Sequence, residues 1–225
     1  MERIGYVSRS WSQPPPYPAP GLDSKRNSAR VAAERLDYND NHICFSIFTE
    51  LKKRIILING FSKSYSMCGY RLGFMAASST IIENITKIQA QTISCPNTIS
   101  QHIAVNVFNR RVNEWLIEKK SMMIMKRDKF LTLFKTLGIT CIVPNSSFYL
   151  FPNISKYYNA KGIDNFNIVD SGTFCEYLLK FFNIACTPGK SFGQDNNIRI
   201  CYSIDMELLD ESISKLCDCF LSIMY

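Results

Sequence analysis

Residues 59–73, NGFSKSYSMCGYRLG, are the stretch that decides the fold of this 225-residue chain. A β-branched apolar run, residues 55–58, leads into this stretch, and a second short apolar run, residues 72–77, leaves it. Short apolar runs bounded by turn residues are typical of buried strands. We therefore expect Lys63 to lie just beyond the end of a buried strand.

Lys63 stands within a pattern of small and basic residues. The other members of the pattern are Gly60, Ser62, Gly69, Arg71 and Gly73. An isolated Ser-Lys dipeptide is usually a pair of solvated loop residues, because short motifs match by chance. The full pattern resembles the Schiff-base lysine segment of the class I and II aminotransferases, enzymes that use pyridoxal 5′-phosphate. The two glycines beside the arginine fit positions where the backbone passes close to a neighbour or takes a positive φ.

The resemblance implies roles for three residues of this stretch. Lys63 would bind the cofactor aldehyde covalently and then carry a proton between substrate and cofactor. Arg71 would bind the cofactor phosphate, because a guanidinium offers a planar fork of donors and stays charged. Ser62 is a further candidate donor to this phosphate, although Gly60 stands where other branches of the family carry a serine.

Arg199 is the second candidate site residue, in the run NIRICYS of residues 197–203. On a strand Ile198 and Ile200 point to one face, so Arg199 points to the other. An isolated arginine of this kind is most often a surface charge. In the aminotransferases, however, this run and the preceding PGKSFG, residues 188–193, resemble the strand whose arginine clamps the substrate α-carboxylate.

Helix-like and strand-like segments alternate after the lysine stretch, which predicts an α/β fold. The expected helices cover residues 80–90 behind a Ser79 cap, a segment from about 98, 112–137 with Gly138 as its C′ residue, 172–182 behind Asp170-Ser171, and 206–224. The expected strands cover residues 139–143 and 148–151, read as a hairpin, and 197–203. The resemblance implies the pyridoxal-phosphate-dependent transferase fold type I, with part of the large-domain sheet and a small α+β C-terminal domain.

Three segments are expected along the chain. Residues 1–30 are rich in Pro and Ser, lack hydrophobic periodicity and are expected to be unstructured. Residues 31–125 would form the remainder of the large cofactor-binding domain with the Schiff-base lysine. Residues 126–225 would form the small C-terminal domain.

The resemblance covers only the second half of a complete family member. The first half would supply an aromatic ring against the pyridine, an asparagine on its hydroxyl and an aspartate on its nitrogen, and the aspartate keeps the ring able to accept electrons. Arg30 and Ala33 stand where this aspartate and a nearby tyrosine would fall, and neither residue replaces them. Two interpretations stay open: an incomplete aminotransferase, or an inactive remnant that acts as a dimerising or binding protein.

The composition is that of a globular protein and gives little support to a nucleic-acid-binding function. The net charge of +7 comes from 26 Lys and Arg against 19 Asp and Glu, but the basic residues are scattered and no nucleic-acid-binding module is present. The nine cysteines and two histidines show no metal-ligand spacing, so no metal is expected. The aminotransferase resemblance implies amino acid and 2-oxo acid substrates and a homodimer, and no nucleic-acid partner is expected.

The expected compartment is the cytoplasm. No apolar run reaches the roughly 18 residues that a membrane helix needs, so no membrane association is expected. The serines and basic residues of the first thirty positions leave organelle import as an alternative, although Pro14, Pro15 and Pro16 would break an amphipathic helix there.

Overall fold

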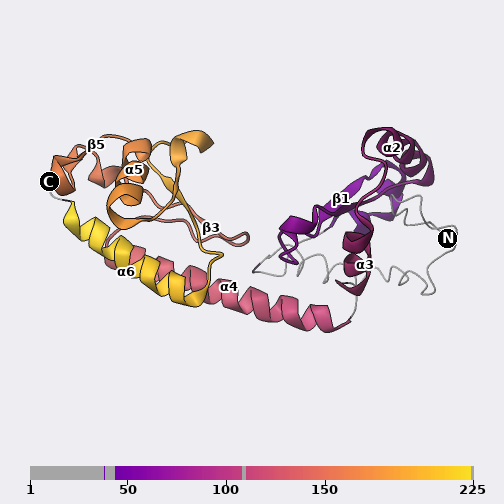
Figure 1. Ribbon diagram of the computed structural model, residues 1–225, viewed down its shortest axis with the longest axis horizontal. Helices are drawn as coiled ribbons and strands as arrows, with labels where there is room; N and C mark the ends of the chain where they lie inside the picture. Colours follow the sequence, from indigo (N-terminus) through magenta and orange to yellow (C-terminus); the bar gives the residue numbers. More distant parts are fainter. Residues whose placement is uncertain (1–37, 39–43, 108–109, 224–225) are drawn as a thin grey trace. The chain divides into compact units, whose positions relative to one another are not determined.

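The computed structural model describes Tyr38 and residues 44–107 and 110–223. The chain divides into two compact units, residues 1–119 and 120–225, and the division falls within the long helix α4 (Arg110–Thr136) (Figure 1). The boundary expected after residue 125 lies in the same helix. The segment expected to be unstructured lies outside the described residues, as do Arg30 and Ala33.

The first unit combines an antiparallel hairpin with helices. Strands β1 (Leu57–Gly60) and β2 (Gly73–Ala76) pair with Gly60 opposite Gly73. The helices are α2 (Ser79–Thr92), α3 (Thr98–Val107) and the first part of α4, with short 3-10 helices at Phe45–Ile47, Thr49–Arg54 and Cys68–Tyr70. The lysine stretch is therefore the connection of a hairpin.

The strand before Lys63 is exposed on one face and only partly buried on the other, so the prediction of a buried strand is wrong for this chain. The side chain of Ile58 is 66% exposed and that of Ile56 is 47% exposed. A strand is buried on both faces only inside a larger sheet that other elements cover. In the part of the chain that the structure describes, this sheet has two strands.

Most buried core residues of the first unit come from the connection between β1 and β2 and not from the strands themselves. Its buried members are Phe61, Tyr65, Met67 and Leu72 from the connection, Ala104 from α3 and Leu116 from α4. The ring of Phe61 lies 5.6 Å from the rings of both Tyr65 and Phe74, within the range of favourable aromatic pairs. The connection is thus a packed part of the unit, which fixes the backbone around Lys63.

The helix predictions in this unit are right in type and shifted at the ends. The residue that caps α2 is Ser78 rather than Ser79, and its side chain makes no capping hydrogen bond. Two adjacent serines offer the helix alternative starting points, and here the extended backbone conformation falls on Ser78. Helix α3 begins at Thr98 as predicted, and it is buried at Ala104, whereas Ile99 is 68% exposed.

The second unit holds a three-stranded antiparallel sheet in the order β3-β7-β6 and a separate antiparallel pair, β4-β5. The strands are β3 (Tyr149–Leu150), β4 (Ala160–Lys161), β5 (Asn167–Ile168), β6 (Thr187–Pro188) and β7 (Ile198–Cys201). The helices are α5 (Ser171–Phe182), α6 (Met206–Ser222) and the second part of α4, with 3-10 helices at Ser155–Tyr157, Ile163–Asn165 and Gly189–Phe192.

The expected hairpin of residues 139–143 and 148–151 is not formed. Residues 139–143 form no strand, and β3 pairs instead with β7, with Tyr149 opposite Cys201 and Leu150 opposite Ile200. The apolar run at 139–143 does not form a buried strand either, since Ile142 is 86% exposed. A local pattern predicts an extended segment but not its partner, and here the partner lies far along the chain.

Helices α5 and α6 build the core of the second unit with buried aromatic residues. The side chains of Phe174, Tyr177 and Leu178 on α5 are fully buried. The ring of Phe220 on α6 stacks on that of Phe174 at 5.8 Å between centroids. Helix α6 runs along the second half of α4 (Figure 1), where Lys129 bonds to Asp210 at 2.6 Å.

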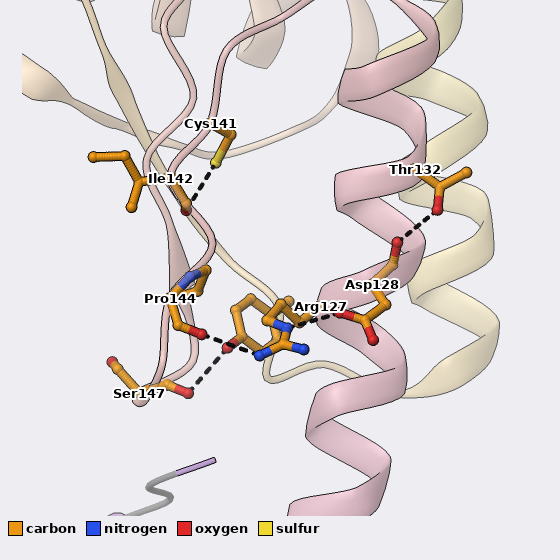
Figure 2. A network of polar contacts seen from close by, with 8 residues as sticks. Arg127, Asp128, Thr132, Cys141, Ile142, Pro144 and Ser147 are labelled. Carbon is orange, nitrogen blue, oxygen red and sulfur yellow. Dashed lines mark hydrogen bonds and ion pairs between the residues drawn. The ribbon is translucent and has the colours of Figure 1, made fainter. Parts of the chain in front are cut away.

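Arg127 ties α4 to the segment that precedes β3. Its Nη1 donates to the carbonyl oxygen of Pro144 at 3.1 Å, and its Nε donates to Asp128 at 2.8 Å. Figure 2 shows the guanidinium reaching from the helix to this segment. The hydroxyl of Tyr202, just after β7, donates to the carbonyl of Ser147 at 3.0 Å in the same network. These hydrogen bonds hold the segment before β3 against both α4 and the end of β7.

The two caps predicted in this unit, Gly138 after α4 and Asp170 before α5, are confirmed, whereas α6 ends at Ser222 and not at the predicted residue 224. Gly138 has a φ of +63°, and Ile139 N bonds to Phe134 O at 2.8 Å while Gly138 N bonds to Lys135 O at 3.2 Å. This pair of backbone hydrogen bonds is the Schellman motif, which satisfies the last carbonyls of α4. At the start of α5, Asp170 accepts from Thr173 N at 2.8 Å in a capping box.

We expect Asp170→Ala to lower the free energy of unfolding by about 1 kcal/mol, the usual effect of removing an N-cap side chain. The hydrogen bond from the Thr173 backbone holds the pKa of the Asp170 carboxyl below its ordinary value. A depressed pKa stabilises the fold above the pKa of the unfolded state, and this contribution is lost as the pH falls through the folded-state pKa. Urea denaturation of the intact chain followed by circular dichroism measures both effects. Asp170→Asn is the control, because it keeps an acceptor and should remove only the acid dependence.

Candidate functional site

Hydrogen bonds close the connection that carries Lys63. Phe61 N donates to Leu72 O at 3.2 Å, which extends the hairpin ladder past its last strand pair. Inside this closure Tyr65 N donates to Phe61 O and Ser66 N donates to Lys63 O, both at 3.3 Å. Lys63 therefore lies in one helical turn whose backbone is fixed at both ends.

The three residues assigned to the cofactor all lie in this connection. Lys63 and Arg71 are exposed, and Ser62 is half-buried. Arg71 takes the left-handed conformation with φ +51° and ψ 45°, and its Nη1 donates to Cys68 O at 3.2 Å. Residues 61–72 include no acidic residue. The connection thus presents an amine, a guanidinium and hydroxyl groups without a carboxylate among them.

The prediction for the two glycines of the pattern is half right. A Cβ at Gly73 would meet the carbonyl oxygen of Asn59 at 3.0 Å, so this position needs glycine for the close approach of the strands. At Gly69 the prediction is wrong, since a Cβ would meet nothing within 4 Å and its φ is not positive. The positive φ values of this connection fall on Ser66 and Arg71 instead.

Arg199 lies on β7 in the second unit. Ile198 and Ile200 are buried on one face and Arg199 is half-buried on the other, as the alternation predicts. Its guanidinium carbon lies 4.4 Å from the ring centre of Tyr149 and 4.6 Å from that of Phe192. Two rings at these distances hold the guanidinium by cation–π attraction and restrict its rotation.

The residues around Arg199 were not predicted as site residues. Besides the two rings, Thr187 accepts from Nη2 of Arg199 through its hydroxyl at 3.3 Å. The register of β6 and β7 places Thr187 directly opposite Arg199. This pairing is long-range, and the sequence contains no local signal for it. The arrangement keeps a planar cation in one orientation, which suits the bidentate binding of a carboxylate.

Lys119 is a further residue of the first unit that was not predicted. Its Nζ donates to the carbonyl oxygens of Lys63 at 3.0 Å and Ser64 at 3.1 Å, and to Oγ of Ser66 at 2.7 Å. In the sequence Lys119 is one of several scattered basic residues of a long helix. Only its contact with the connection distinguishes it.

The donor set of the connection fits two ends of pyridoxal phosphate. An amine such as that of Lys63 condenses with an aldehyde, and the guanidinium of Arg71 suits a phosphate. The absence of acidic residues from 61–72 also favours an anionic ligand. The ring nitrogen and ring face of the cofactor would need groups beyond those of this connection.

Two buried thiols of this chain, those of Cys175 and Cys219, are poor alternatives as nucleophiles. Burial raises the pKa of the Cys175 thiol to about 12, with a smaller contribution from the charge of Asp170. Burial likewise raises the pKa of Cys219 to about 12. A thiol with such a pKa is protonated at neutral pH and reacts slowly. Within residues 38, 44–107 and 110–223, no group of three or more His, Cys, Asp or Glu side chains could hold a metal ion.

The fold places this chain with fold type I of the pyridoxal-phosphate-dependent transferases, the fold of its solved structural neighbours. The family model for aminotransferase class I and II matches residues 31–216. This chain therefore belongs to the class I and II aminotransferase family, as the sequence resemblance predicted. Its mixed helices and sheets match those of the family's solved structures.

Named relatives agree with this assignment. A probable aspartate/prephenate aminotransferase of Rickettsia conorii is 36% identical over 171 residues, which are 76% of this chain and 42% of the relative. The aspartate aminotransferase of Bacillus subtilis is 32% identical over 186 residues, 81% of this chain and 46% of the relative. The crystal structure of the aspartate aminotransferase from Rhizobium meliloti matches with a TM-score of 0.75 at 26% identity, over 85% of this chain and 48% of that one.

The chain spans about half the length of the curated relatives that it matches. In the described part of the chain, no helix is both long and apolar enough to cross a bilayer.

Proposed function

We propose that this chain carries the lysine-bearing half of a pyridoxal-phosphate-dependent aminotransferase that moves an amino group between an aspartate-like amino acid and a 2-oxo acid. The observation that carries this proposal is the position of Lys63 in a packed, hydrogen-bonded turn, with Arg71 in the same connection and family membership over residues 31–216. The substrate class rests on the names of the relatives in Rickettsia and Bacillus.

In this proposal each site residue has one task. Lys63 would provide the amine that holds the cofactor aldehyde, and its Nζ, once the substrate amino group has displaced it, would accept the proton of the substrate α-carbon and pass it on to the cofactor. Arg71 neutralises the cofactor phosphate, with Ser62 as an additional donor. Arg199 binds the substrate carboxylate, held in place by Tyr149 and Phe192. Bound pyridoxal phosphate supplies the electron sink that makes the α-proton acidic.

The alternative is a catalytically inactive remnant that acts as a dimerising or binding protein. The exposed side chains of Ile56 and Ile58 on the hairpin offer apolar surface for such an association. In either case we propose a homodimer of cytoplasmic location, without nucleic-acid or membrane partners.

Addition of pyridoxal phosphate to the dilute intact chain tests the proposal. We expect a visible absorbance band that borohydride removes, and mass spectrometry should place the reduced pyridoxyl group on the peptide that contains Lys63. L-aspartate, added before borohydride, should then change the absorbance of a catalytic chain and leave that of an inactive remnant unchanged. A reduced label spread evenly over exposed lysines would contradict cofactor binding at this site.

Replacement of Arg199 tests the carboxylate role. We expect Arg199→Lys to weaken the binding of 2-oxoglutarate about tenfold or more, because a lysine loses the bidentate fork, and a hydrogen bond to a charged group contributes about 1.5–3 kcal/mol. Isothermal titration calorimetry of the cofactor-loaded chain measures the affinity. Lys190→Met, which removes an exposed cation of the same unit, is the matched control and should change the affinity little. Equal affinities for the Arg199→Lys variant and the unmodified chain would rule the role out.

A further inference from the structure

The ammonium of Lys119 meets three oxygens of the turn that carries Lys63. Two are main-chain carbonyls, those of Lys63 and Ser64, and the third is the hydroxyl oxygen of Ser66, all between 2.7 and 3.1 Å from Nζ. A lysine ammonium has three N–H donors and no acceptor. The number of acceptors in the turn therefore matches the number of donors that Lys119 offers.

The course of α4 explains why Lys119 reaches this turn. Leu116, three residues earlier, is fully buried in the core that holds Phe61 and Tyr65. Residues three apart on a helix share a face, so the packing of Leu116 carries Lys119 to the same side. Trp115, one turn earlier, lies under the ammonium at 4.8 Å from its ring centre. The ring and the core thus direct a long, flexible side chain to one place.

The turn that Lys119 meets includes a backbone conformation that costs free energy. Ser66 has a φ of +55°, in the left-handed region, which disfavours a residue with a Cβ. This conformation lets Ser66 N donate to Lys63 O at 3.3 Å, and the same oxygen accepts from Lys119. The ammonium of Lys119 therefore stabilises the turn at the carbonyl oxygen of Lys63, which also accepts the hydrogen bond that closes the turn. A hydrogen bond that involves a charged donor is roughly twice as strong as a neutral one.

Burial lowers the pKa of the Lys119 amine below its ordinary value, because the charged form loses contact with water. The three oxygen acceptors replace part of the lost hydration. A lysine so placed is a structural cation of the first unit rather than one of the solvated charges of the helix surface.

We propose that Lys119 is a positioning residue for Lys63. The ammonium of Lys119 binds the carbonyl oxygen of Lys63 and so fixes the direction in which the Lys63 side chain leaves the backbone. The link to cofactor chemistry rests on the function proposed above, whereas the clamp does not. A nucleophile acts efficiently only from a defined position, and supporting hydrogen bonds that lock its backbone provide that position. The residue that holds the amine thus comes from a helix that begins well beyond the hairpin.

Three variants of the intact chain test this clamp. Lys119→Met keeps the apolar stem and removes the donors, Lys119→Arg keeps a cation with several donors, and Ser66→Ala removes one acceptor without altering α4. Lys87→Met removes an exposed lysine of α2 and serves as the matched control. Two quantities are measured: amide hydrogen exchange of the peptide with residues 63–67 by mass spectrometry, and the rate at which pyridoxal phosphate with borohydride labels Lys63.

We expect Lys119→Met to speed exchange in residues 63–67 and to slow the labelling of Lys63 about tenfold, the effect of losing hydrogen bonds to a charged group. Lys119→Arg should bring both the exchange rate and the labelling rate most of the way back to those of the unmodified chain. Ser66→Ala should change both rates less than Lys119→Met does, in the same direction. Lys87→Met should match the unmodified chain. Unchanged exchange in both Lys119→Met and Ser66→Ala would overturn the clamp. Faster exchange with an unchanged labelling rate would overturn the positioning role. If the unmodified chain takes no label at Lys63, the proposed function fails, and the exchange comparison still decides whether the clamp exists.

Discussion

Lys63→Ala is expected to remove the borohydride-stable pyridoxyl label from residues 59–73 completely. The reason is chemical, since only a primary amine condenses with the aldehyde, and no other lysine or amine lies in this stretch. The side chain of Lys63 is exposed, so its truncation leaves the core formed by Phe61, Tyr65 and Leu72 in place. The loss should therefore be specific to the label and not to the fold.

The measurement is peptide mass spectrometry after incubation with pyridoxal phosphate and reduction. Lys87→Ala is the control, because Lys87 is exposed on α2 in the same unit and should keep full labelling at Lys63. Circular dichroism should give the same spectrum and unfolding midpoint for both variants. Persistence of the visible absorbance band in Lys63→Ala at its original strength would rule out Lys63 as the residue that binds the cofactor.

Gly189→Ala is expected to destabilise the second unit strongly. A Cβ at this position would meet the carbonyl oxygen of Asn197 at 2.1 Å and that of Gln194 at 2.2 Å, and both are backbone atoms that cannot rotate away. The same two residues bond to Gly189, with Gly189 N donating to Asn197 O at 2.8 Å and Gln194 N donating to Gly189 O at 3.1 Å. Relief of the overlap would therefore break the turn. We expect the free energy of unfolding to fall by about 3 kcal/mol or more, which is the upper end of the usual cost of overpacking.

Urea denaturation of the intact chain measures this loss. Gly69→Ala is the matched control, because a Cβ there would meet nothing within 4 Å and its φ is not positive, so its effect should stay within about 0.5 kcal/mol. The turn at Gly189 follows β6, whose register with β7 sets Thr187 opposite Arg199. Gly189→Ala should thus also weaken carboxylate binding. A variant with unchanged unfolding would show that the turn can open without cost.

Some features of the fold could be predicted because they depend on neighbours in the sequence. The end of α4 at Gly138 and the start of α5 at Asp170 follow from capping chemistry within a few residues. The side of β7 that bears Arg199 follows from the two-residue period of a strand. The candidate site residues Lys63 and Arg71 follow from a pattern of fifteen consecutive residues, 59–73, that resembles a known family segment.

Other features depend on which distant segment a residue meets. The pairing of β3 with β7 replaced an expected hairpin, because apolar runs specify an extended chain but not its partner. The exposure of Ile58 likewise depends on how many strands the sheet has and what covers them. The rings of Tyr149 and Phe192 reach Arg199 from β3 and from the turn after β6, and only the folded sheet brings them together.

By itself the sequence determined the family, and it named Lys63 and Arg199 as the candidates for binding the cofactor and a carboxylate, since these patterns lie in short runs of residues. Only the tertiary structure decided that the lysine lies in a packed turn and that Lys119 holds this turn. The two lysines are separated by 56 positions in the chain. The physical reason is that hydrogen bonds and side-chain packing act over a few ångströms in space, whatever the separation along the chain, and only folding determines which residues come that close.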